Sequence, residues 1–171
     1  MRTCLRLSVL LTFLLLALGC RYNIRSTTPP HIRRVRVDSF KNATDKRNLS
    51  FELITALKRE LRSSAGIKIV TKDADGLISG RILSYTKKPL IEDTRDRIIE
   101  SQIIITAEIS FRDVRNEKWI IRKARTSNSN INHRSGIYRL TPEGSGEDSA
   151  SRNAVNELAR ALMRVIETES W

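Results

Sequence analysis

The feature that most constrains the fold of this chain is a long alternation of apolar and polar residues between positions 98 and 112. One side of this segment consists of Ile103, Ile105, Ala107, Ile109 and Phe111. The other side carries Gln102, Thr106, Glu108 and Ser110. A period of two indicates a β-strand with one buried and one open face. We therefore expect a sheet that is covered on one side only.

Shorter segments of similar character predict further strands at 32–40, 67–70, 77–85 and 118–125. The polar residues 113–117 between the long strand and 118–125 predict a hairpin. Gly80 interrupts its strand and predicts a bulge or a close approach. Lys87, Lys88 and Pro89 predict the end of that strand and a polar loop through Arg97. Residues 126–136, rich in Asn and Ser, also predict a loop.

Two segments show apolar residues at helical spacing, 51–61 and 154–165. Asn48 or Ser50 is suited to cap the first helix, and the acidic residues from Glu147 suit the start of the second. Two amphipathic helices require one apolar surface to cover, and the strands supply it. The predicted fold is therefore an α+β two-layer sandwich, with a mostly antiparallel four-stranded sheet and both helices on one face.

The first nineteen residues have the features of a secretory leader. Arg2 and Arg6 precede an apolar run at 7–18, and Gly19 lies directly before Cys20. The run is shorter than the roughly 20 residues that span a bilayer. A charged start, an apolar stretch and a small residue at the cleavage site predict a signal peptide over residues 1–19. A cysteine directly after that site resembles the lipobox of bacterial lipoproteins.

Removal of the leader would leave Cys20 as the only cysteine, because Cys4 leaves with it. A single cysteine forms no internal disulfide, and a lone thiol in an exported protein requires an explanation. Lipidation of Cys20 with acyl chains such as palmitate supplies one, since several chains anchor durably. Ordinary secretion with a free thiol is the alternative. Residues 20–31, with Pro29 and Pro30, then form the lipidated cysteine and tether, and 32–171 form a single domain.

The net charge of the chain is +12, and subtracting Arg2 and Arg6 leaves +10 on the mature part. Such an excess of positive charge attracts polyanions. Export argues against nucleic acid as the partner and favours phosphorylated glycolipids, acidic headgroups or anionic wall polymers. A basic surface that only maintains solubility is the alternative.

Patterns typical of enzymes are weak in this sequence. His31 and His133 have no companion ligand at metal spacing, and no glycine-rich loop suits a phosphate cradle. Asp73 and Asp75 could form an acid–base pair, but their setting favours a role in shaping a turn. We therefore predict a non-enzymatic protein without a metal or cofactor.

Basic residues cluster around three of the predicted strands. If 77–85, 98–112 and 118–125 are neighbours, these residues can converge on one sheet edge or loop end and hold phosphates. The alternative for each is a solvated surface charge. The candidates are Lys87, Lys88, Arg95, Arg97, Arg122, Lys123 and Arg125.

Several segments resemble the LptE family of lipopolysaccharide-assembly lipoproteins. The similar segments are residues 37–44, the helix at 51–61, the strand at 74–82, the start of the long strand at 100–103 and the closing helix at 154–167. The resemblance implies a lipid-anchored protein on the periplasmic side of the outer membrane. It also implies a plug inside the β-barrel LptD that helps the barrel to fold and binds lipopolysaccharide. The family's lipid-contacting basic residues correspond loosely to Arg95, Arg97, Arg122 and Lys123.

An envelope lipoprotein that regulates a peptidoglycan synthase or a secretion channel is the alternative function, because such proteins share the opening strand and helix. Their tethers are usually long. Here the eleven residues 21–31 extend at most about 40 Å, which favours a domain held close to the membrane.

Overall fold

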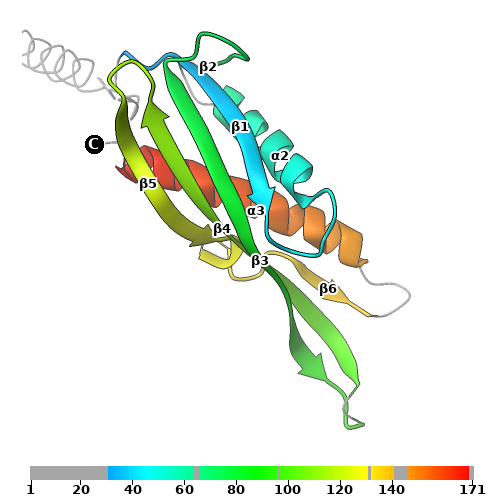
Figure 1. Cartoon of the computed structure of the whole chain (residues 1–171). Coiled ribbons are helices and arrows are strands. Elements are labelled where there is room, and N and C mark those ends of the chain that lie inside the picture. Colours follow the sequence, from blue (N-terminus) through cyan, green and yellow to red (C-terminus); the bar gives the residue numbers. More distant parts are fainter. Residues whose placement is uncertain (1–30, 64–65, 96, 131, 141–145, 170–171) are drawn as a thin grey trace, which may run out of the picture.

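Two helices cover one face of a six-stranded sheet in the computed structural model of the chain (Figure 1). The structure describes residues 31–63, 66–95, 97–130, 132–140 and 146–169. Its elements in chain order are β1 (Arg34–Asn42), α2 (Leu49–Ser63), β2 (Lys68–Ile69), β3 (Gly76–Glu92), β4 (Ile98–Asp113), β5 (Lys118–Ser127), the 3₁₀ helix η1 (Asn128–Asn130), β6 (Ile137–Arg139) and α3 (Glu147–Glu169).

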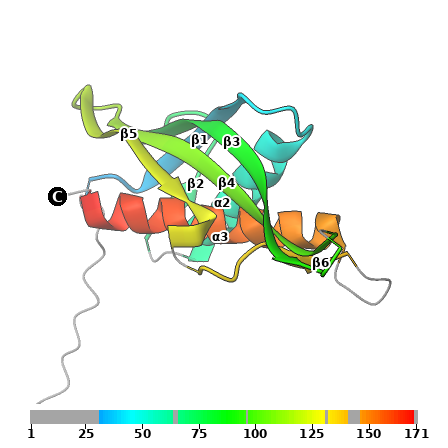
Figure 2. The same cartoon turned by 90° about the horizontal axis from the view of Figure 1, so that it is seen from below.

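The strand order is β2-β1-β3-β4-β5, and β6 pairs with β4 beyond the end of β5. β1 runs parallel to β2 and β3, while all pairings of β4 are antiparallel. This arrangement confirms the α+β class and the mostly antiparallel sheet. Figure 2 shows α2 and α3 on the same side of the sheet. The sheet has six strands rather than four, because it also includes the short β2 and β6.

The alternation along β4 places its apolar side chains in the core, as predicted. All five apolar residues from Ile103 to Phe111 are at most 1% exposed. They join the apolar stripes of both helices in a single cluster that includes Leu53, Leu57, Leu158 and Leu162. Burial of one face leaves Thr106, Glu108 and Ser110 on the face that the helices do not cover. Gln102 departs from the prediction, because it is buried and donates to the carbonyl oxygens of His133 and Ser135.

The prediction of a polar loop from Lys87 to Arg97 is wrong. β3 continues to Glu92 and pairs with β4 as far as Ile98. Pro89 is tolerated in this stretch because β1 pairs with β3 only as far as Ile82, so β3 beyond that point is a sheet edge. The extension forms an arm, defined here as residues 87–102 with β6, that projects beyond the helices (Figure 1).

The prediction of a loop over residues 126–136 is wrong at its start and correct at its end. β5 extends to Ser127, and η1 follows directly. Asn128 in η1 is fully buried, and Gly136 is followed by β6. A run of Asn and Ser therefore contributes to the sheet layer as well as to a surface connection.

Candidate anion-binding surface and the N-terminal polar network

The uncovered face of the sheet carries a row of charged side chains that crosses four strands. Lys41 of β1 lies opposite Arg81 of β3, Arg81 lies opposite Glu108 of β4, and Glu108 lies opposite Arg125 of β5. Residues paired in this way share one face of a sheet. We call these four residues the basic row. Its three cationic side chains are exposed, and Glu108 is half-buried.

The basic row has the composition of an anion site. Among the described residues, no ion pair engages Lys41, Arg81 or Arg125. An Arg guanidinium offers a planar fork that suits phosphate oxygens, and Lys adds a compact charge. One carboxylate among three cations leaves the row net positive.

A second row lies on the same face near the turn between β4 and β5. It consists of Arg36, Leu77, Arg112 and Trp119, paired in that order across four strands. The guanidinium carbon of Arg112 lies 5.9 Å from the centre of the Trp119 ring. Trp119 is nevertheless 48% exposed. This row therefore presents an aromatic surface beside cations.

The seven basic residues predicted from the sequence do not meet at one place. Lys87 lies opposite Ile103 and Arg125 opposite Glu108, a separation of about 17 Å along β4 at about 3.3 Å per residue. One group lies on the arm: Lys87, Lys88, Arg95 and Arg97. The other lies on β5: Arg122, Lys123 and Arg125. Only Arg125 belongs to the basic row.

Two residues of the arm group have carboxylate partners. Lys87 Nζ lies 2.7 Å from Glu147 Oε2 at the start of α3, and this hydrogen bond raises the pKa of Lys87. Arg97 donates to Asp93 within the arm's turn at 2.7 Å. Asp93 also accepts from the backbone nitrogens of Arg95 and Arg97, which lowers its pKa. The first ion pair fastens the base of the arm to α3, and the second closes the turn at the arm's far end.

Lys123 lies in a β-bulge of β5. The pairing register between β4 and β5 shifts on either side of Phe111. Lys123 takes a positive φ of 55°, and its backbone nitrogen donates to Ser110 Oγ at 3.1 Å. The bulge turns Arg122 and Lys123 out of the regular alternation. Sequence patterns gave no sign of it.

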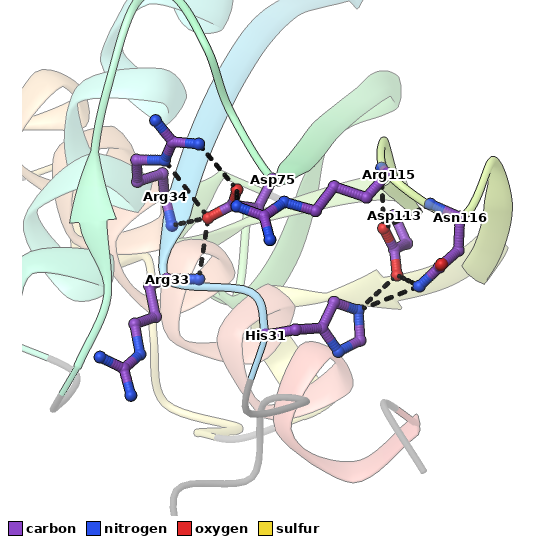
Figure 3. A network of polar contacts seen from close by, with 7 residues as sticks. All are labelled: His31, Arg33, Arg34, Asp75, Asp113, Arg115 and Asn116. Atoms are coloured by element: carbon purple, nitrogen blue, oxygen red, sulfur yellow. Dashed lines mark hydrogen bonds and ion pairs between the residues drawn. The ribbon is translucent and has the colours of Figure 1, made fainter.

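A polar network centred on Asp75 ties the start of β1 to the rest of the sheet (Figure 3). The Asp75 side chain is buried and accepts from the backbone nitrogen of Arg34 at 2.9 Å and its guanidinium at 3.0 Å. Arg115 adds an ion pair at 2.8 Å. The hydrogen bond from Arg34 holds the pKa of Asp75 well below its usual range, although burial opposes this. The Asp75 carboxylate therefore fastens the start of β1 to the sheet, whereas the sequence predicted that it shapes its own turn.

A second carboxylate, Asp113, holds the first described residue. His31 Nε2 lies 2.6 Å from Asp113 Oδ2, and the Asn116 amide donates to the same oxygen at 2.8 Å. Burial disfavours the charged form of Asp113, but the hydrogen bonds from His31 and Asn116 outweigh it and lower its pKa to about 2. The network therefore fastens residue 31 to the turn between β4 and β5 (Figure 3).

Among the described residues, no helix has the length and apolar character needed to cross a membrane. Within the same residues, no group of three or more His, Cys, Asp or Glu side chains is arranged to hold a metal ion. The basic row is the clearest candidate site on the uncovered face.

Solved structures share this fold. The solution structure of uncharacterized lipoprotein B from Nitrosomonas europaea is 13% identical, with a TM-score of 0.54 over 87% of this chain and 90% of that one. A hypothetical protein from Chlamydia trachomatis is 15% identical, with a TM-score of 0.51 over 81% and 98%. At such low identity these similarities show the fold alone. No curated protein matches the chain.

Family membership comes from the sequence of the whole domain. The model of the LptE family, described as lipopolysaccharide-assembly, matches residues 32–168. The match extends from the first described strand almost to the end of α3, and it includes the similar segments at 37–44, 51–61, 74–82, 100–103 and 154–167. Arg21 and Tyr22, which also resemble the family, lie outside the match. The chain therefore belongs to the LptE family of lipopolysaccharide-assembly proteins.

Proposed function

We propose that this protein is a non-enzymatic lipoprotein of lipopolysaccharide assembly, anchored to the periplasmic face of the outer membrane through Cys20. Its family supports the role in assembly. The leader-like residues 1–19 and the cysteine that follows support the anchor. Both lie outside the described residues. Mass spectrometry of the mature N-terminus is the direct test, and an unmodified Cys20 would contradict the anchor.

The proposed partner is an LptD-like β-barrel, in which the domain acts as a plug and assists folding. Family membership supports this proposal. Affinity purification of the full chain from native outer membrane tests it. We expect a large β-barrel to co-purify, and its absence would contradict the partnership without bearing on ligand binding.

The proposed ligand is lipopolysaccharide, whose phosphates would contact the basic row. The observation that carries this proposal is the uncovered face with three exposed cations, Lys41, Arg81 and Arg125, around Glu108. Arg122 and Lys123 extend the positive surface along β5, and Lys88 and Arg95 offer further contacts on the arm. Lys87 and Arg97 would have to exchange Glu147 and Asp93 for phosphate.

A paired substitution tests the ligand site. In the full chain, Arg81→Ala with Arg125→Ala should weaken lipopolysaccharide binding about tenfold or more, because charge-assisted hydrogen bonds are lost. The matched control is Arg152→Ala with Arg164→Ala on the exposed side of α3, which removes the same charge. Equal losses in both variants would show that net charge, and not the basic row, determines binding.

A further inference from the structure

The described chain begins at a fixed point on one end of the sheet. His31 is held 2.6 Å from Asp113, so the first described residue lies beside the turn between β4 and β5 (Figure 3). Cys20 precedes His31 by eleven residues, which span at most about 40 Å. A lipid on Cys20 would therefore keep this end of the domain close to the membrane. The inference below rests on that proposed anchor.

Two large apolar side chains are exposed at this end. Val114 in the turn is 44% exposed, and Trp119 at the start of β5 is 48% exposed. The Arg112 guanidinium lies over the indole on the uncovered face. Tryptophan is enriched where a membrane meets water, because its ring is apolar and its N–H is polar. The turn therefore has the character of a membrane-contacting tip.

Exposed cations outnumber exposed carboxylates around the tip. Asp75 and Asp113 are buried and already bound by Arg34, Arg115 and His31. Within residues 31–36, 72–77 and 112–119, which form the tip, the exposed carboxylates are Asp73 and Glu117. The exposed cations in these segments are Arg33, Arg36, Lys72 and Lys118, together with Arg115, which pairs with Asp75. A surface with this balance complements anionic phospholipid headgroups.

We propose that this end of the domain rests on the anionic surface of the bilayer. Trp119 and Val114 reach the boundary between headgroups and acyl chains, and Arg33 and Lys118 contact lipid phosphates. The lipid anchor and the tip then act as two attachments on the same side of the molecule. This fixes the orientation of the domain while it is outside the barrel, with the arm directed away from the bilayer.

Fluorescence of a single tryptophan tests the contact. The chain has two tryptophans, so Trp171→Phe leaves Trp119 alone. The full lipidated chain is reconstituted in vesicles of phosphatidylethanolamine and phosphatidylglycerol, with or without bromine on the acyl chains. Bromine should reduce Trp119 emission about twofold or more, because an interfacial indole lies within reach of the chains.

A second tryptophan position provides the matched control. Phe51 is 74% exposed near the start of α2, which follows the far end of β1, about 30 Å of strand from the tip. Phe51→Trp in a Trp119→Phe, Trp171→Phe background should show little quenching. Equal quenching at both positions would overturn the proposed orientation.

Vesicle flotation of the same samples separates the two proposals. If the chain floats but Trp119 is not quenched, the anchor is retained and the proposed contact of the tip with the bilayer is overturned. A chain that does not float contradicts the anchor, and the docked tip with it.

Charge reversal tests the role of the headgroups. Arg33→Glu or Lys118→Glu should lower the ratio of docked to undocked domain about fivefold for each basic residue removed. Arg152→Glu, on the exposed side of α3, should leave Trp119 quenching unchanged. Unchanged quenching in the tip variants would overturn the assignment of Arg33 and Lys118 to lipid phosphates.

Discussion

The side-chain oxygen of Asn128 accepts a hydrogen bond from the backbone nitrogen of Ile105 at 2.7 Å. Its amide nitrogen donates to the carbonyl of Ile103 at 3.1 Å. β5 stops pairing with β4 at Thr106, and β6 begins at Gln102, so this amide occupies the gap between two strands. One buried side chain thus replaces a missing stretch of backbone, because an amide has the same donor and acceptor as a peptide group.

Replacing Asn128 should measurably destabilise the fold. Asn128→Ala leaves the Ile105 nitrogen and the Ile103 carbonyl without this partner, and a buried unsatisfied group costs about 1–3 kcal/mol. Chemical denaturation of the full chain measures the loss. Asn130→Ala is the control, because Asn130 is exposed and makes one side-chain bond, to Thr126. Equal effects of the two substitutions would contradict the role assigned to Asn128.

Gly80 is expected to tolerate no side chain. A Cβ atom there would lie 2.3 Å from Phe40 Cε1 and 2.5 Å from the carbonyl oxygen of Glu108. We expect Gly80→Ala to lower the free energy of unfolding by about 1–3 kcal/mol through overpacking. Gly146→Ala is the control, since a Cβ there meets nothing within 4 Å. A stable Gly80→Ala protein would show that Phe40 can move aside.

Stability should fall at acid pH through Asp113. Its pKa is lowered from 3.8 to about 2, so the folded state binds fewer protons than the unfolded state between these values. The resulting stabilisation is complete above about pH 4 and is lost as the pH falls toward 2. In Asp113→Asn, the slope of stability against pH in this window should be smaller than in the parent chain. Denaturant midpoints measured across this pH window test the prediction. An unaltered slope would exclude Asp113 as a source of the pH dependence.

Glu108 should weaken anion binding, because it is the carboxylate within the basic row. Glu108→Gln should strengthen lipopolysaccharide binding about twofold to fivefold at low salt, and screening should reduce the gain at high salt. Titrations at two salt concentrations measure both effects. Glu52→Gln on α2 removes the same charge away from the row and serves as control. A weaker complex with Glu108→Gln would mean that the carboxylate positions Arg81 or Arg125.

Local sequence patterns were sufficient to predict the elements in which buried and exposed residues follow a regular period. The alternation along β4 and the stripes of α2 and α3 each show in sequence which face is buried. The expectation of a close approach at Gly80 is confirmed by the contacts that a Cβ would make. Pro89 misled the prediction, because its tolerance depends on where the pairing of β1 with β3 stops, at Ile82 of β3, which is a property of the assembled sheet.

The basic row could not be predicted from the sequence, for a related reason. Lys41, Arg81, Glu108 and Arg125 become neighbours only through strand register, and that register shifts at bulges in three of the pairings. A one-residue slip would reverse the face of every side chain. Asn128 was missed because a side chain that replaces backbone is recognisable only when the neighbouring strands are placed.

The arm has a consequence for how copies of this protein behave when crowded. Beyond Ile82, β3 lacks β1 as a neighbour, so the free edge of a long ribbon faces outward. Such edges template pairing between molecules and lead to aggregation. Pro89 has no backbone donor to offer, and Lys87 and Lys88 place like charges where a second copy would approach. The same residues that look like strand breakers in the sequence therefore oppose edge-to-edge pairing along the long ribbon.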